Sequence, residues 1–272
     1  MAAVLHLPRL FWLIGHILIM NSTNNKTTEN TNTTIDKLFA VGAHFGFTKR
    51  RRHPTVIPYL YGTKDGSDII DLEQTSQQLH QVAQVVEEMA SQGKTILYVG
   101  TKDEVAKQVQ KAAEKVSAPY VVNRWIGGML TNFSEIKRRI KRLSDLQSEN
   151  LSGELERKYT KKERVMIGRE MNKLTFNFGG IQTLNRVPDL MVVVDPRFND
   201  IAVEEAKMIK IPVIGIMGSD SDVTNVTYPV VMNDALQGSV ALALEVLTDA
   251  QQRGATKAAS AAPASTSRHT TR

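Results

Sequence analysis

The 272-residue sequence contains no cysteine. Disulfide frameworks, thiol nucleophiles, zinc ribbons and iron–sulfur clusters are therefore excluded, because each of them needs cysteine sulfur. The sequence also contains neither G-x-G-x-x-G nor G-x-x-x-x-G-K-[ST], the glycine-rich patterns that hold nucleotide phosphates between a strand and a helix. The common dinucleotide-binding and P-loop enzymes are thus not indicated.

A catalytic or metal-binding constellation is missing as well. The six histidines include no pair at the i, i+4 spacing of a helical metal site. Asp195, Asp220 and Asp222 follow apolar runs without an evident lysine or histidine partner, so we interpret them as turn residues. We expect no cofactor and no bound metal. The alternative is a flavodoxin-like nucleotide-binding or phosphoacceptor enzyme that uses Thr101, Lys102 and Asp195.

The two ends of the chain differ from its middle. Residues 10–20 are apolar but fewer than the about 20 residues that cross a bilayer, and residues 21–34 are almost all polar. We expect Met20 to be the true start and residues 1–34 to be a disordered extension, with an export signal as the alternative. Residues 253–272 are expected to form a disordered basic tail, which leaves 35–252 as the folded domain.

Between these ends, short apolar runs alternate with helical periods. Nearly continuous apolarity is typical of strands that are covered on both faces in a parallel sheet. Apolar residues step by three and four from Leu79 to Met89, which predicts a helix over 72–91. This alternation predicts a flavodoxin-like, doubly wound α/β fold in three layers with a five-stranded parallel sheet. The expected strands are 95–99, 119–122, 190–195, 212–217 and 228–232, and the other expected helices are 103–117, 201–209 and 235–247.

Residues 132–178 interrupt the alternation. Asn132 with Glu135 resembles a capping box, which starts a helix. A narrow apolar seam follows, at Ile136, Ile140 and Leu143. After a break near residue 153, a second helix is expected over 154–176, so the segment is predicted to be an inserted antiparallel helical hairpin. Such a hairpin buries little surface of its own, which favours contact with a partner.

Positive charge is concentrated on the first hairpin helix. The formal net charge is +6, and five cations occupy six positions of this helix: Lys137, Arg138, Arg139, Lys141 and Arg142. Glu135 is the only acid before Asp145, whereas a solvated helix usually interleaves acids at i+4. The row favours an RNA or DNA backbone, because a membrane surface needs a broader apolar face and a mononucleotide needs a pocket. A merely solvated helix face is the alternative.

Short motifs in the order of one known family extend over about residues 36–250. The most specific is Arg124-Trp-Ile-Gly-Gly-Met-Leu-Thr-Asn132 followed by the basic helix, and Val41-Gly-Ala-His-Phe-Gly46 is the second. On these motifs the chain resembles the bacterial-type family of protein number two of the small ribosomal subunit. Phe47 stands where that family usually has a second histidine, and Asn123 where a histidine is frequent.

The resemblance implies a flavodoxin-like core with a helical hairpin, and a structural, non-enzymatic role in translation as part of a cytoplasmic ribonucleoprotein. It also implies binding of small-subunit ribosomal RNA at the head–body junction and recruitment of the large mRNA-binding protein of the subunit. Neighbouring small-subunit proteins are implied partners, and no membrane partner is expected. By position, the implied RNA-binding residues are His44, Lys49, Arg50, Arg51, Arg52, Arg124, Thr131, Asn132, Lys137, Arg138, Arg139, Lys141 and Arg142.

Overall fold

The computed structural model describes residues 34–261; the predictions for residues 1–33, including Met20 as the start, and for 262–272 lie outside the described residues. Its centre is a five-stranded parallel sheet in the order β5-β4-β6-β7-β8. Counted along the chain within this sheet, the order is the 2-1-3-4-5 of flavodoxin-like folds. The predicted fold class and all five predicted strands are therefore confirmed. The strands are β4 (Ile96–Val99), β5 (Tyr120–Val121), β6 (Leu190–Val194), β7 (Val213–Met217) and β8 (Tyr228–Val231).

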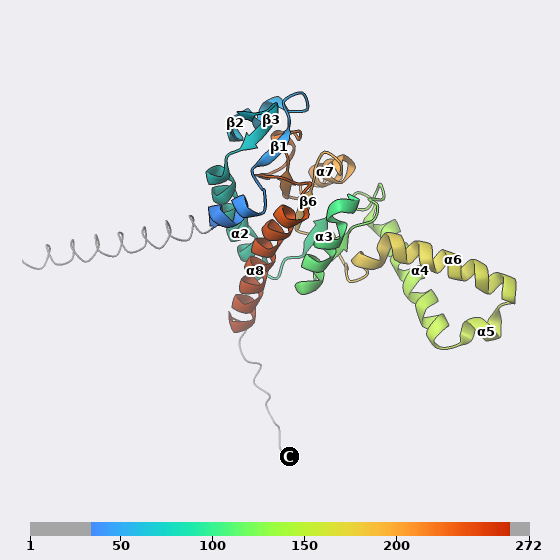
Figure 1. Ribbon diagram of the computed structural model, residues 1–272. Helices are drawn as coiled ribbons and strands as arrows, with labels where there is room; N and C mark the ends of the chain where they lie inside the picture. Colours follow the sequence, from blue (N-terminus) through green and yellow to red (C-terminus); the bar gives the residue numbers. More distant parts are fainter. Residues whose placement is uncertain (1–33, 262–272) are drawn as a thin grey trace, which may run out of the picture.

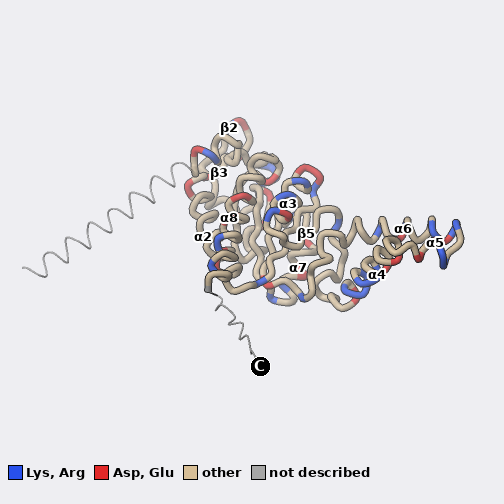
Figure 2. The backbone as a smooth tube through the Cα atoms, turned by 90° about the horizontal axis from the view of Figure 1, so that it is seen from below, with Lys and Arg blue, Asp and Glu red and all other residues tan. Residues whose placement is uncertain are grey.

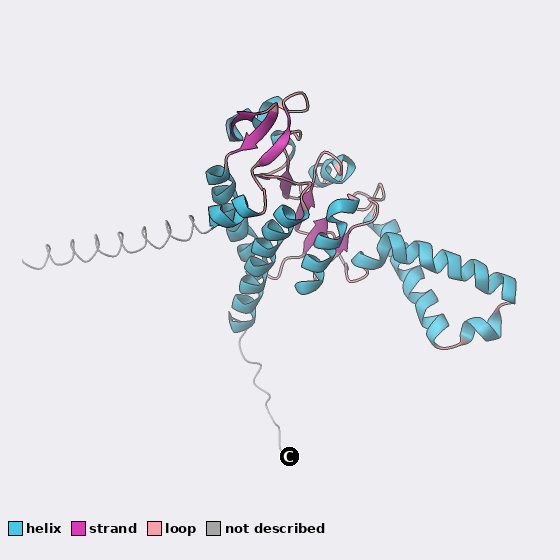
Figure 3. Cartoon of the chain, in the orientation of Figure 1, coloured by secondary structure: helices cyan, strands magenta, loops and turns pink. Residues whose placement is uncertain are grey.

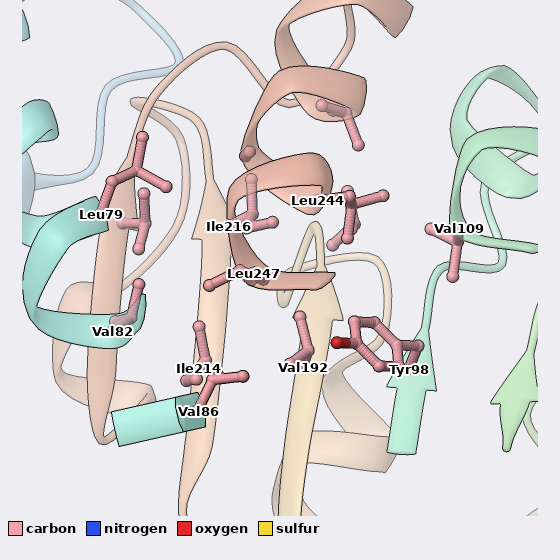
Figure 4. Close-up of a cluster of buried hydrophobic side chains, with 14 of the residues drawn as sticks. Leu79, Val82, Val86, Tyr98, Val109, Val192, Ile214, Ile216, Leu244 and Leu247 are labelled. Atoms are coloured by element: carbon pink, nitrogen blue, oxygen red, sulfur yellow. The ribbon is translucent and has the colours of Figure 1, made fainter. Parts of the chain in front are cut away.

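Helices cover both faces of this sheet (Figure 1). They are α2 (Leu72–Ser91), α3 (Asp103–Lys115) and α8 (Gln237–Ala261) on one face, and α7 (Asp200–Met208) with the inserted hairpin on the other. Alternate side chains of β6 enter the two layers, since Val192 joins the first cluster and Val193 the second. Figure 4 shows side chains of α2 and α8, among them Leu79 and Leu244, packed over the first face. Burial on both faces explains why the strands lack polar alternation.

A second, antiparallel sheet was not predicted. It has the order β1-β3-β2, with strands β1 (Phe45–Thr48), β2 (Leu60–Lys64) and β3 (Ser67–Ile70). Its strands are short and mostly exposed on one face, so they carry few apolar residues for a pattern to detect. One signal was available: Asp65 and Gly66 both have positive φ in the turn between β2 and β3, and Asp-Gly is a strong hairpin signal. The 3-10 helices are η1 (Pro54–Tyr59), η2 (Gly179–Ile181) and η3 (Val223–Asn225).

The last helix continues beyond residue 252, where the sequence predicts the disordered tail to begin. Helix α8 ends at Ala261, and its last turns pack along α2. Glu87 of α2 pairs with Arg253 at 3.1 Å and also with Lys257. A Cβ on Gly254 would collide with the Glu87 carbonyl oxygen, so glycine permits the close approach. These contacts extend the helix through nine residues that were assigned to the tail.

The inserted hairpin is present and projects from the sheet (Figures 1 and 3). It consists of α4 (Phe133–Leu151), α5 (Glu154–Lys158) and α6 (Lys161–Phe178), and the predicted seam residues are buried. The predicted second helix is divided at Thr160, which forms a capping box with Glu163. The capping box predicted at Asn132 does not form, because Glu135 points toward the arginines of its own helix. Within residues 34–261, no helix combines the length and the apolarity needed to cross a bilayer.

Candidate nucleic-acid interface

The cations of α4 lie on its exposed surface, and Figure 2 shows Lys and Arg gathered along α4 and at α5. Three of the five have an acidic partner. Glu135 lies 3.1 Å from Arg138 Nη1 and 3.8 Å from Arg139 Nε. Arg142 Nε lies 3.3 Å from Glu170 of α6, a pairing that the sequence of α4 alone could not reveal. The prediction of unrelieved charge is therefore wrong for Arg142, and Glu135 relieves part of the charge of the other two arginines.

The remaining two lysines have no acidic partner within residues 34–261. Lys137 Nζ donates to the carbonyl oxygen of Asn185 at 3.4 Å, and Lys141 makes no hydrogen bond or ion pair with a described residue. The hairpin as a whole, residues 133–178, contains twelve Lys and Arg against seven Asp and Glu, a net charge of +5. Most of the net charge of the chain is thus carried by an element that projects from the sheet.

The loop before α4 is held by a buried carboxylate. Glu205 of α7 is 6% exposed and accepts hydrogen bonds from the loop over residues 125–131. Its Oε1 accepts from Trp125 Nε1 at 3.1 Å and from the Gly128 amide at 2.8 Å. Its Oε2 accepts from the Leu130 amide at 2.9 Å, and from the Thr131 amide and hydroxyl at 3.1 and 3.2 Å. We call this arrangement the Glu205 clamp.

The pKa of Glu205 reflects the clamp. Burial alone would raise the pKa of this carboxyl, but the hydrogen bonds from the loop outweigh burial and hold the pKa below its ordinary value. Glu205 is therefore a buried carboxylate whose charge is satisfied by loop dipoles. Glu205 lies within the helix that the sequence predicts over residues 201–209. The buried side of this helix carries Ala202, Val203 and Ala206 together with Glu205, whereas Ile201 is 53% exposed.

The clamp brings together the predicted site residues that surround α4. Arg124 is exposed and has no hydrogen-bond or ion-pair partner in the described part of the chain. Thr131 is tied to Glu205, and Asn132 is the exposed N-cap of α4. Trp125 is only 8% exposed, so it packs in the core. We call the exposed cations here, Arg124, Lys137, Arg138, Arg139, Lys141 and Arg142, the basic root.

The structure places the second basic run elsewhere, at the end of β1. Lys49 and Arg50 are exposed and have no side-chain partner among residues 34–261. Arg51 pairs with Asp220 at 2.8 Å and lies over the Phe47 ring, 4.3 Å from its centroid. Arg52 donates through Nε to Asp68 at 2.8 Å, and the Asp68 carboxyl is fully buried. The last two arginines thus hold the antiparallel sheet in place.

His44 lies between two aromatic rings. The ring centroids of Phe39 and Phe45 are 4.5 and 4.0 Å from that of His44. Burial lowers the pKa of His44, so its neutral form is favoured. A neutral, stacked imidazole is a poor ligand for phosphate. In the structure His44 therefore belongs with the aromatic side chains of Phe39 and Phe45 and not with the basic root.

The edge of the main sheet where an enzyme of this fold would bind its ligand has a pocket of about 550 Å³, and the charged side chains that line it are paired with each other. Lys102 Nζ lies 3.2 Å from Asp195 Oδ2, a contact between residues 93 positions apart in the chain. Asp220 accepts from both Arg51 and Arg197. The β1 segment lies across this edge, since the Phe47 amide donates to Ser219 Oγ at 2.8 Å. In the described part of the chain, no group of three or more His, Asp or Glu converges to hold a metal ion.

Several known proteins resemble this chain over most of its length. The model of the family described as ribosomal protein S2 matches residues 38–254. The chain is 39% identical over 221 residues to the small ribosomal subunit protein uS2c of Rhodomonas salina, covering 81% of this chain and 90% of that protein. It is 39% identical over 222 residues to the uS2 protein of Mesoplasma florum, covering 82% and 83% of the two chains.

A third relative is the uS2 protein of Nocardia farcinica, which is 40% identical over 221 residues, 81% of this chain and 77% of that protein. The matched residues include the antiparallel sheet, the main sheet and the whole hairpin. With a family model over most of its length and relatives of this identity, the chain belongs to the ribosomal protein S2 family.

Proposed function

We propose that this chain binds the RNA of the small ribosomal subunit through the basic root, at the junction of head and body. As a member of the ribosomal protein S2 family, the chain is a structural protein of that subunit and not an enzyme. Its contribution to translation is then positional: a rigid sheet carries a cationic hairpin that is held among RNA helices.

One observation carries the RNA proposal. Arg124, Lys137 and Lys141 are exposed cations without an acidic partner in residues 34–261, and they lie around the start of one ordered helix. Cations on an ordered element repel each other unless counterions or a polyanion neutralise them. Phosphates can replace the counterions, and the released ions then drive binding. Lys49 and Arg50 provide a smaller second contact, while Arg51 and Arg52 position the segment that carries them.

A nucleotide pocket at the edge of the sheet would not neutralise the cations of the hairpin. The flavodoxin-like enzyme considered above needs an open crevice at the carboxyl ends of β4 and β6. In this chain the β1 segment crosses that edge, and the charged side chains around the pocket there are engaged with each other: Lys102 with Asp195, and both Arg51 and Arg197 with Asp220. The unpartnered cations around the start of α4, Arg124, Lys137 and Lys141, do not line that pocket, which supports a structural RNA-binding role.

Sedimentation tests the proposal directly. The full-length chain should migrate with small subunits in a gradient at low salt and should dissociate progressively as salt rises, because added cations compete for the phosphates. A chain that stays at the top of the gradient at low salt, or whose association does not depend on salt, would contradict it.

We further propose that an aromatic surface, formed by Phe39, Phe45 and Tyr61, recruits the large mRNA-binding protein of the subunit. Phe39, Phe45 and Tyr61 are 62%, 51% and 84% exposed. Phe39 and Tyr61 line a groove of about 390 Å³ whose rim carries Asp71 and Glu73. Exposed aromatic side chains are the usual anchors of protein interfaces, and an acidic rim disfavours RNA phosphates. The antiparallel sheet and the hairpin lie at opposite ends of the molecule in Figures 1 and 2, so both partners can bind at once.

A single substitution separates this second proposal from the first. Small subunits assembled with Tyr61→Ala should retain the chain but bind the large mRNA-binding protein about tenfold more weakly, as expected for loss of an aromatic anchor. Met208→Ala, which truncates a 72% exposed side chain on α7, is the matched control and should change neither. Unchanged recruitment by the Tyr61 variant would refute the assignment of this surface.

A further inference from the structure

The loop over residues 125–131, which precedes the basic helix α4, is tied to the main domain by the buried carboxylate of Glu205. All five hydrogen bonds of the Glu205 clamp come from backbone amides, one hydroxyl and one indole, and none comes from a lysine or arginine. Gly128 has φ +86°, a conformation that brings its amide toward the carboxylate. Converging amide dipoles of this kind form a cradle for an anion, and here the anion is a side chain of α7.

The clamp is continuous with the basic root on both sides. Arg124 directly precedes Trp125, whose indole is the first donor. Thr131, the last donor, is followed by the N-cap Asn132 and by α4. Ile136 and Ile140 of α4 pack in the same cluster as Trp125 and Ala202 of α7. The direction in which α4 leaves the sheet is therefore fixed by one apolar cluster and by one carboxylate.

We propose that Glu205 is a positioning residue for RNA binding: it does not touch RNA, and by clamping residues 125–131 it holds Arg124 and the α4 cations in register with the phosphates. This inference rests on the proposed function of the basic root. It also assigns a role to the Trp-x-Gly-Gly motif, which supplies the indole and the glycine turn that close on the carboxylate. Pre-organisation of the root reduces the entropy that RNA binding would otherwise cost.

The geometry makes both oxygens of the carboxylate necessary. Oε2 accepts three hydrogen bonds from Leu130 and Thr131, and Oε1 accepts two. In Glu205→Gln one oxygen is replaced by the NH2 of a carboxamide, which donates hydrogen bonds and cannot accept them from these groups. At least two loop donors are then unpaired, and the loop is expected to move away from α7.

If Glu205 had no positioning role, electrostatics alone would predict the opposite effect of Glu205→Gln on RNA affinity. Removing a negative charge from a protein that binds a polyanion should leave affinity unchanged or raise it. Glu204, the exposed neighbour on α7, has no hydrogen-bond or ion-pair partner within residues 34–261 and supplies the matched control. We expect Glu204→Gln to bind as tightly as the parent chain or slightly more tightly, and Glu205→Gln to bind about tenfold more weakly.

The experiment measures the Kd of the full-length chain for small-subunit ribosomal RNA as a function of salt, with the melting temperature of each variant as a check of folding. The slope of log K against log salt should be smaller for Glu205→Gln than for the parent, because fewer cations engage together. Folded Glu205→Gln with the Kd and slope of the parent would overturn the inference. A parent chain that does not bind this RNA would instead overturn the proposed function.

If Glu205→Gln does not fold, Trp125→Phe decides the question, because it removes one donor of the clamp and keeps a ring in the core. Trp125 is buried, so the substitution removes no contact that RNA could make. A folded Trp125→Phe chain that binds RNA more weakly than the parent supports the inference. A folded Trp125→Phe chain that binds as the parent does overturns it.

Discussion

Charge removal on α4 gives a quantitative test of the RNA interface. Lys137 and Lys141 are spaced i, i+4, exposed, and free of acidic partners in residues 34–261. Each phosphate that a protein cation neutralises contributes about 0.9 to the slope of log K against log salt for duplexes and about 0.7 for single strands. The double variant Lys137→Gln/Lys141→Gln should therefore reduce the slope by about 1.4–1.8.

That change in slope predicts a difference in affinity which is easy to measure. Over a fourfold rise in salt, the parent chain should lose about 7- to 12-fold more affinity than the double variant. Binding to small-subunit RNA is measured at several salt concentrations, with the same protein preparation throughout. Lys107→Gln/Lys111→Gln is the matched control, because these lysines share the spacing and the exposure and have no partner within residues 34–261, but lie on α3.

The comparison has two results that would refute the reasoning. An unchanged slope in the α4 variant would mean that Lys137 and Lys141 do not meet phosphates. An equal decrease in the α3 control would mean that the effect is general charge and not a located interface. Arg142→Gln should reduce the slope by less than the about 0.7–0.9 expected for an unpartnered cation, because Glu170 already neutralises part of the charge of Arg142.

Two further predictions concern buried carboxyl groups, those of Asp68 and Asp234. Arg52→Gln leaves the fully buried Asp68 carboxyl without its charged partner and should lower the free energy of unfolding by about 3 kcal/mol, without changing the RNA salt slope. Lys49→Gln/Arg50→Gln should instead lower the salt slope without loss of stability. Urea unfolding and RNA titration of both variants separate the two roles, and equal behaviour of the two variants would contradict the assignment. Asp234 is 1% exposed, and burial, reinforced by the charge of Asp195, raises its pKa to about 7. Because the pKa of Asp234 is higher in the folded than in the unfolded chain, the parent should lose stability as pH rises from about 4 through 7. The free energy of unfolding of Asp234→Asn should therefore rise relative to that of the parent over this range, by up to about 4 kcal/mol. A difference between the two chains in urea unfolding that stays constant from pH 5 to pH 8 would refute this.

The main sheet could be predicted because its chemistry is local. Strands buried on both faces need continuous apolar residues, and β6 and β7 have them. The seam of α4 and the break near Gly153 were readable for the same reason. The antiparallel sheet was missed because β2 is almost entirely exposed, which leaves the Asp-Gly turn as its main signal.

The site was less predictable, because its contacts join residues far apart in the chain. Glu205 meets Trp125 across 80 positions, and Arg142 meets Glu170 across 28. A sequence window around either residue shows one partner without the other. The second hairpin helix was misread for a simpler reason, since Thr160 and Glu163 have the capping-box spacing and mark the start of α6 within the predicted helix.

The location of the RNA interface is tested most directly by ultraviolet cross-linking of assembled small subunits, followed by mapping of the peptides that carry RNA. The proposed interface predicts that cross-linked peptides concentrate in residues 124–142, with a smaller group around Lys49 and Arg50. Cross-links confined to α2, α3 and α8, on the opposite face of the sheet, would contradict it.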